Sequence, residues 1–194
     1  MSSDANPYEP PSAEAQVAEP AKGDTSDYER RRRALAQVER ETLMIGSVIA
    51  AVGVVLLGKA IPQLPNIDDR VTGVMVGVTL AEGGLRVLAG ALVWKLRASG
   101  RILHAIAVGF SLLLRVGGEL LATGKIGNAT AFLLGPPLVL YVLWRKPARE
   151  VFGREYREKV VPVTKGPALT KEFWMMHLVL AWITAQMLWA VLRQ

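Results

Sequence analysis

Five long apolar runs constrain this chain more than any other feature of its sequence. They occupy residues 43–61, 71–94, 102–123, 126–144 and 173–192. Each is close to the roughly 20 residues that a helix needs to cross about 30 Å of hydrocarbon. Backbone groups in lipid must be hydrogen-bonded internally, and the runs lack the alternation typical of barrel strands. The sequence therefore predicts an all-α integral membrane protein with five transmembrane helices.

The segment before the first run has a different composition. Residues 1–28 contain four prolines among small and acidic residues, with few large aliphatic side chains. Burial of such a segment cannot offset the entropy lost on folding, so we expect a disordered acidic tail before a membrane domain at 29–194. The first 40 residues lack a basic stretch followed by an apolar core, so the run at 43–61 is expected to be an uncleaved anchor.

Basic residues lie mainly on one side of the predicted membrane. With an odd number of spans, sixteen Lys and Arg residues flank the runs on the side of the N-terminus and four flank them on the other. Cytoplasmic flanks carry the excess of Lys and Arg, so we expect the N-terminus in the cytoplasm and the C-terminus outside. Trp94, Trp144 and Trp174 lie at the predicted cytoplasmic ends of the runs, where indole rings favour the membrane interface.

The longest predicted loop, at residues 145–172, is basic and contains a helical pattern. Its apolar residues recur at helical spacing and are Ala148, Val151, Phe152, Tyr156 and Val160. They predict a short cytoplasmic interfacial helix whose bases lie near anionic lipid headgroups. The bases expected there are Arg149, Arg154, Arg157 and Lys159. A solvated connector is the alternative, and Gly153 weakens the helix prediction.

Two passages near this loop resemble a known family. Trp94-Lys95-Leu96-Arg97 precedes the third run, and Arg149-Glu150-Val151-Phe152-Gly153-Arg154-Glu155-Tyr156-Arg157 follows the fourth. A Val-Phe pair followed a few residues later by Glu-Tyr is similar to a pattern that links two late helices in a family of small bacterial multi-span inner-membrane proteins. The Asn-Pro-Tyr-Glu-Pro-Pro start resembles the short tails of that family. The resemblance implies a bacterial inner membrane and no catalytic residue, because no activity is assigned to the family.

Four charged residues inside the second and third runs are the strongest functional signal. They are Glu82, Arg86, Arg115 and Glu119. Each costs about 2.5 to 3.5 kcal/mol at mid-membrane unless it is paired or hydrated. Glu82 and Arg86 can pair within one helix, and depths counted at about 1.5 Å per residue favour Glu82 with Arg115 between helices. The four charges are expected to form a buried network that fixes the fold, a polar path for an ion or solute, or a subunit contact.

Small residues accompany these charges. The glycines expected at helix contacts are Gly73, Gly77, Gly83, Gly84, Gly117 and Gly118. Glycine allows two helices to approach closely, so the spans at 71–94 and 102–123 are predicted to pack as a hairpin.

Composition excludes several function classes. The chain has no cysteine, which excludes thiolate metal sites and a Cys nucleophile. His104 and His177 have no His, Asp or Glu three or four residues away, so no metal and no cofactor are expected. The basic residues flank apolar runs, so we expect no nucleic-acid partner. Gly109-Phe110-Ser111-Leu112 is similar to an intramembrane serine-protease motif, but the second glycine is missing and the predicted depth separates Ser111 from His177.

The sequence favours a non-enzymatic membrane protein that acts as a scaffold, an accessory or a regulatory subunit, because no catalytic set accompanies its contact elements. The expected partners are a bilayer with anionic lipids and a membrane protein or further copies of the chain. The alternative is a small oligomeric transporter or channel that uses the four charges. A water-accessible cavity at the charges would favour transport, and a dry, fully paired cluster would favour a structural role.

Overall fold

The computed structural model describes residues 22–116, 120, 130–167 and 169–193, and everything below concerns these residues. Their regular elements are α1 (Lys22–Ala60), η1 (Ile61–Asn66), α2 (Arg70–Trp94), α3 (Ala98–Ser111), η2 (Leu112–Val116), α5 (Thr130–Trp144), α6 (Lys146–Val151), η3 (Tyr156–Val160) and α7 (Lys171–Leu192). No strand occurs in the described ranges, and the all-helical fold agrees with the sequence prediction.

Three helical stretches are long and apolar enough to cross a membrane, namely Thr25–Asn66, Thr72–Trp94 and Lys171–Ala190. They match the first, second and fifth predicted runs. The other two apolar helices, Ala98–Leu114 and Gly135–Trp144, are shorter. The ends predicted for the third and fourth runs, at residues 123 and 126, lie outside the described residues.

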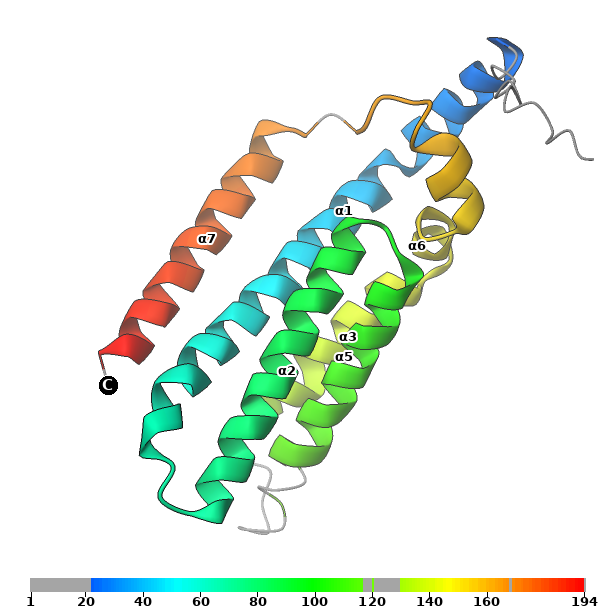
Figure 1. Ribbon diagram of the computed structural model, residues 1–194. Helices are drawn as coiled ribbons and strands as arrows, with labels where there is room; N and C mark the ends of the chain where they lie inside the picture. The colour runs from blue at the N-terminus through cyan, green and yellow to red at the C-terminus, as the bar shows by residue number, and fades with distance from the viewer. Residues whose placement is uncertain (1–21, 117–119, 121–129, 168, 194) are drawn as a thin grey trace, which may run out of the picture.

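The helices form a bundle with one peripheral member (Figure 1). Neighbours α1 and α2, α2 and α3, and α3 and α5 pack against each other, and α7 packs against α1 at the edge of the bundle. Basic residues from several helices gather at one end. Arg145 pairs there with Glu41 of α1, and Arg101 donates a hydrogen bond to the Leu143 carbonyl at 3.3 Å.

One stripe of buried residues runs along most of α1. Its members are spaced alternately by three and four positions and are Arg32, Leu35, Glu39, Thr42, Gly46, Ile49 and Gly53. This spacing keeps them on one helix face. The residues of the stripe are polar towards the N-terminus of α1 and small or apolar in its predicted membrane-spanning part. One helix therefore packs in a polar environment at one end and in an apolar environment further along.

Helix α1 begins earlier than the sequence indicated. Residues 22–28, which we expected in the disordered tail, form its first turns. Ion pairs support these turns, from Asp27 to Arg30 at 3.1 Å and from Glu29 to Arg33 at 3.2 Å. Tyr28 also packs against the cluster around Leu35, which gives the segment the apolar contact that its composition did not indicate.

Glycines bring α1 and α2 into close contact. A Cβ at Gly53 would lie 2.7 Å from the Gly83 carbonyl oxygen, and a Cβ at Gly90 would lie 2.5 Å from the Gly46 carbonyl oxygen. Neither position has room for a larger residue, so this antiparallel contact requires glycine. The two glycines of each helix are seven residues apart, which places them on one face.

Only some of the glycines that we predicted at helix contacts lie at such a contact, and the partner helix is not always the expected one. Gly83 contacts α1, whereas we expected a contact with the third span. A Cβ at Gly77 or Gly84 would meet nothing within 4 Å, and one at Gly73 would meet the Ile67 side chain at 3.1 Å. It is Gly100 that brings α3 close to α2, because a Cβ there would lie 2.6 Å from the Val93 nitrogen.

Residues 146–164, which we call the cap, correct the prediction of one interfacial helix. The cap contains α6 and η3, and the two are separated by a break at Phe152 and Gly153. All of its expected apolar residues are buried, namely Ala148, Val151, Phe152, Tyr156 and Val160. Their partners include Leu35 and Leu96, so this apolar face packs on protein and is not available to lipid.

Candidate functional site

The charged centre of the bundle consists of Glu82, Arg86 and Ser111, which we call the membrane cluster. Arg86 Nε donates to Glu82 Oε1 at 2.9 Å and Arg86 Nη2 donates to Ser111 Oγ at 2.8 Å. The Ser111 hydroxyl in turn donates to Glu82 Oε1. The three residues are only 3%, 4% and 1% exposed, so α2 and α3 share a closed polar contact inside an apolar bundle.

Local helix geometry explains the cluster. Glu82 precedes Arg86 by one helical turn, so their side chains lie on one face and the acid comes first, which is the favoured order. Gly83 and Gly90 hold this part of α2 against α1, and α3 contributes Ser111 from the other side. The pairing of Glu82 with Arg86 is the within-helix pair that the sequence indicated.

The other half of the predicted charge network is not described. The backbone of Arg115 belongs to η2, but its side chain, together with Gly117, Gly118 and Glu119, lies outside the described residues. The interhelical pair of Glu82 with Arg115 therefore stays a prediction.

Two cavities adjoin the membrane cluster on either side of the same α1 face. One of about 360 Å³ is lined by Glu82, Arg86 and side chains of α7. The other, of about 300 Å³, is lined by Arg86, His104 and α5. The remaining lining is mostly aliphatic, and Val48 and Val52 of α1 line both.

His104 is an anomaly beside the second cavity. It is 2% exposed, and neither ring nitrogen has a hydrogen-bond partner in the described part of the chain. A buried donor without a partner destabilises a fold by about 1 to 3 kcal/mol. We therefore expect His104 to lower the stability of the bundle.

Ser111 and His177 do not form a catalytic pair. Ser111 bonds within the membrane cluster, whereas His177 Nε2 lies 2.8 Å from Ser47 Oγ on α1. His177 Nδ1 lies 2.8 Å from the Phe173 carbonyl, which can only accept, so Nδ1 carries the proton and Nε2 accepts from Ser47.

Ser47 and His177 have the spacing of a nucleophile and its base. However, Ser47 Oγ also accepts the Trp94 indole N–H at 2.7 Å, and its hydroxyl lies 3.2 Å from the Leu43 carbonyl oxygen. No hydrogen bond or ion pair between His177 and an acidic side chain occurs in the described ranges. The pair joins α7 to α1 and α2, with Trp94 and Phe173 packed on the imidazole ring.

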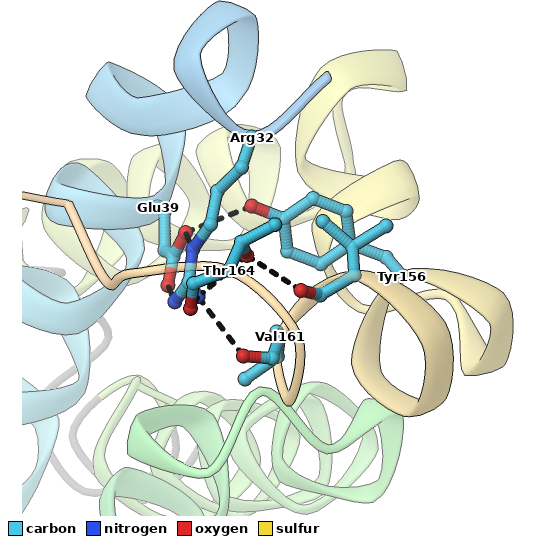
Figure 2. A network of polar contacts seen from close by, with 6 residues as sticks. Arg32, Glu39, Tyr156, Val161 and Thr164 are labelled. Atoms are coloured by element: carbon cyan, nitrogen blue, oxygen red, sulfur yellow. Dashed lines mark hydrogen bonds and ion pairs between the residues drawn. The ribbon is translucent and has the colours of Figure 1, made fainter. Parts of the chain in front are cut away.

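Sequence reasoning missed a second buried ion pair, on the part of α1 that contacts the cap (Figure 2). Arg32 Nη2 donates to Glu39 Oε1 at 2.8 Å, and the Tyr156 hydroxyl donates to Glu39 Oε2 at 2.8 Å. Arg32 Nη1 reaches the carbonyl oxygens of Val161, at 3.1 Å, and Thr164, at 2.8 Å. We call Arg32, Glu39, Tyr156 and Thr164 the clamp, because they fix the cap to α1.

A signal for the clamp was present in the sequence. Arg32 and Glu39 are seven residues apart and continue the face of Gly46 and Gly53. Burial raises the pKa of Tyr156, and the hydrogen bond to Glu39 raises it further. The tyrosine therefore stays protonated and can act as a donor in the clamp.

The bases that we expected at lipid headgroups lie on the outside of the cap. Arg154 pairs with Glu158 at 2.8 Å, and this bond raises the pKa of Arg154 and lowers that of Glu158. Arg157 lies 3.6 Å from the same carboxylate, and Arg149 Nε donates to the Trp144 carbonyl. Lys159 is exposed. A lipid contact for these bases stays a prediction.

Among the described residues, no group of three or more His, Cys, Asp or Glu side chains could hold a metal ion. Comparisons with family models, curated proteins and solved structures find no match to this chain. The assignment of a function therefore depends on the geometry alone.

Proposed function

We propose that this chain is a non-enzymatic integral membrane protein that acts as a scaffold, an accessory or a regulatory subunit. In this proposal it crosses a bacterial inner membrane five times, with the N-terminus in the cytoplasm and the C-terminus outside. The excess of Lys and Arg on one side of the runs supports the orientation. Packing of α3 and α5 within the bundle supports their assignment as spans.

The main observation that supports the proposal is that the three side chains of the membrane cluster bond to one another. Arg86 pairs with Glu82, and Ser111 bonds both, in surroundings that are otherwise mostly aliphatic. Charges that serve a transport path face water, whereas a buried pair fixes the position of its helices. The described part of the cluster thus has the properties of a structural element.

The cytoplasmic end supports a role in contacts. Helix α1 continues far beyond the predicted start of the first span at residue 43, and the clamp holds it against the cap. Its outer side carries exposed charges, among them Arg30 and Arg33. A braced, charged helix next to a membrane is a suitable surface for another protein.

A small transporter or channel is the second candidate function. The observation that favours it is that cavities of about 360 and 300 Å³ both reach Arg86. If water filled them, the two cavities would bring solvent to both sides of the membrane cluster.

Two measurements separate these functions. A photo-cross-linking residue placed at Arg33 or at Trp182, both exposed, should give a stoichiometric cross-link to one protein in the native cells. Absence of any protein cross-link at both sites would overturn the scaffold proposal. Purified protein in liposomes should show no proton or potassium leak above that of empty liposomes. A leak that disappears in Glu82→Gln would favour the transporter.

A further inference from the structure

A series of cavities lies between α7 and α1, beside the contacts that hold the two helices together. A cavity of about 440 Å³ at the basic end and a second of about 390 Å³ share the side chains of Met44, Glu172 and Met176. The second cavity shares Leu180 and Ile183 with the third, of about 360 Å³. We call this series of cavities the α7 groove. It passes from a charged rim to the level of the membrane cluster.

The length of the α7 groove matches one membrane leaflet. From Glu172 to Ile183 the helix advances by about 16 Å at 1.5 Å per residue. Half of a hydrocarbon core of about 30 Å is about 15 Å. Exposed tryptophans, Trp94, Trp144 and Trp174, lie at the ends of α2, α5 and α7 near the rim, as expected for side chains at headgroup level. The apolar walls therefore have the length of an acyl chain.

The rim carries equal numbers of positive and negative side chains. Arg40 and Arg145 supply two positive charges, and Glu41 and Glu172 supply two negative ones. Glu172 lies in the first turn of α7, and its side chain is exposed at the rim. A balanced rim complements a headgroup that itself has both signs of charge, and it offers less to a purely anionic headgroup.

We propose that the α7 groove holds a phospholipid whose headgroup carries a phosphate and a primary amine. The phosphate lies towards Arg40 and Arg145, the amine donates hydrogen bonds to Glu172, and an acyl chain follows Met44, Met176 and Ile183. This site differs from the basic outer surface of the cap, where anionic lipids were expected. It depends on the membrane placement proposed above and not on the scaffold role.

The test uses the full chain in detergent micelles, with bound lipid measured by native mass spectrometry. The probes are phosphatidylethanolamine, phosphatidylcholine, whose methylated amine cannot donate a hydrogen bond, and phosphatidylglycerol, which has no amine. We expect phosphatidylethanolamine to bind at least about tenfold more tightly than either, which is the low end of the range for one hydrogen bond to a charged group. Glu172→Gln should abolish this preference, whereas Asp68→Asn, a control in an exposed segment at the opposite end, should retain it.

A second variant tests the groove itself. Met176→Trp fills the space between the two upper cavities and should weaken the binding of all three lipids, while the control Leu178→Trp, at an exposed position of α7 that lines none of the three cavities, should leave their binding unchanged. Equal binding of the three lipids, a preference for phosphatidylglycerol, or a lipid-free dimer as the main species would overturn the proposal. Any of these results would leave the scaffold proposal intact, because that proposal depends on protein cross-links.

Discussion

Two buried Arg–Glu pairs occur among the residues that the structure describes, and they differ in what they connect. Arg32 and Glu39 are seven residues apart on α1 and bond to Tyr156, Val161 and Thr164, more than a hundred positions away. Arg86 and Glu82 are one turn apart on α2 and bond to Ser111 of the neighbouring helix. The first pair fixes a distant segment to a helix, whereas the second stabilises the contact between two adjacent helices.

Their surroundings differ as well. The cap is bordered by partly exposed ion pairs, such as Arg31 with Glu150 and Glu155, so water can reach its edge. The membrane cluster is bordered mostly by aliphatic side chains of α1, α5 and α7. A charge that loses its partner can be rehydrated in the cap, but not in the bundle. Substitution of one partner of an Arg–Glu pair should therefore cost far more stability in the membrane cluster than in the clamp.

The largest effect is expected in the membrane cluster. Glu82→Met leaves the Arg86 guanidinium without its carboxylate in a region of low dielectric, and should lower the free energy of unfolding by about 3 to 5 kcal/mol. Replacing both residues by Met should restore most of this loss, because an apolar pair of similar volume avoids the desolvation of both charges. Unfolding by SDS in mixed micelles measures the three variants.

The matched control is an exposed pair with the same spacing. Arg154 and Glu158 are also four residues apart, but their side chains are 84% and 49% exposed. Glu158→Met should lower the free energy of unfolding far less than Glu82→Met does, since solvent screens such pairs. Equal costs at Glu82 and Glu158, or no recovery in the double Met variant, would contradict the view that burial in the bundle sets the difference.

A smaller loss of stability is expected for a substitution in the clamp. Glu39→Gln removes the charge that Arg32 and Tyr156 share, and should cost about 1.5 to 3 kcal/mol, the range for a hydrogen bond to a charged group. The Val161 and Thr164 carbonyls still accept from Arg32, so the loss should stay below that of Glu82→Met. Limited proteolysis should show faster cleavage within residues 146–164. Unchanged cleavage would show that the clamp does not hold the cap.

Replacement of the unpaired side chain of His104 should raise the stability of the protein, whereas the substitutions above should lower it. His104→Leu removes two ring nitrogens without partners beside Arg86, and should raise the free energy of unfolding by about 1 to 3 kcal/mol. His177→Leu is the control and should destabilise the protein, because it loses the bond to Ser47. A loss of stability in His104→Leu would show that the cavity supplies His104 with a partner such as water.

The sequence predicted those features that depend on spacing along one helix. The second and fifth apolar runs agreed in length with their helices, the first lies within a longer helix, and the spacing of Glu82 and Arg86 gave their pair. It did not predict that Gly83 packs on α1, because two glycines seven residues apart show a shared face but not its partner. The matching pair on α1, Gly46 and Gly53, would have indicated that partner had the two runs been compared.

The clamp was missed for a related reason. Tyr156 was interpreted as part of an apolar face, which is correct for its ring, while its hydroxyl finds Glu39 on a helix 117 positions away. Only a structure can show such a distant partner. The early start of α1 depended likewise on Tyr28, whose contact with the cluster around Leu35 needs the cap to be in place.

The smallest effect is expected at Tyr156, and it depends on pH. Tyr156→Phe removes one hydrogen bond and should cost about 0.5 to 1.5 kcal/mol near neutral pH. Burial, followed by the bond to Glu39, raises the pKa of Tyr156 above the ordinary value of 10.0. Below pH 10 the phenol is protonated in both the folded and the unfolded chain, so its contribution is fully present.

Above pH 10 the unfolded chain loses the Tyr156 proton first, so the stabilisation by this residue is lost as the pH rises towards its raised pKa. The difference in unfolding free energy between the wild type and Tyr156→Phe should therefore be constant up to about pH 10 and become smaller above it. A difference that stays constant above pH 10 would mean that water reaches the Tyr156 hydroxyl. The clamp would then be hydrated, and its surroundings would differ more from the mostly aliphatic lining of the membrane cluster.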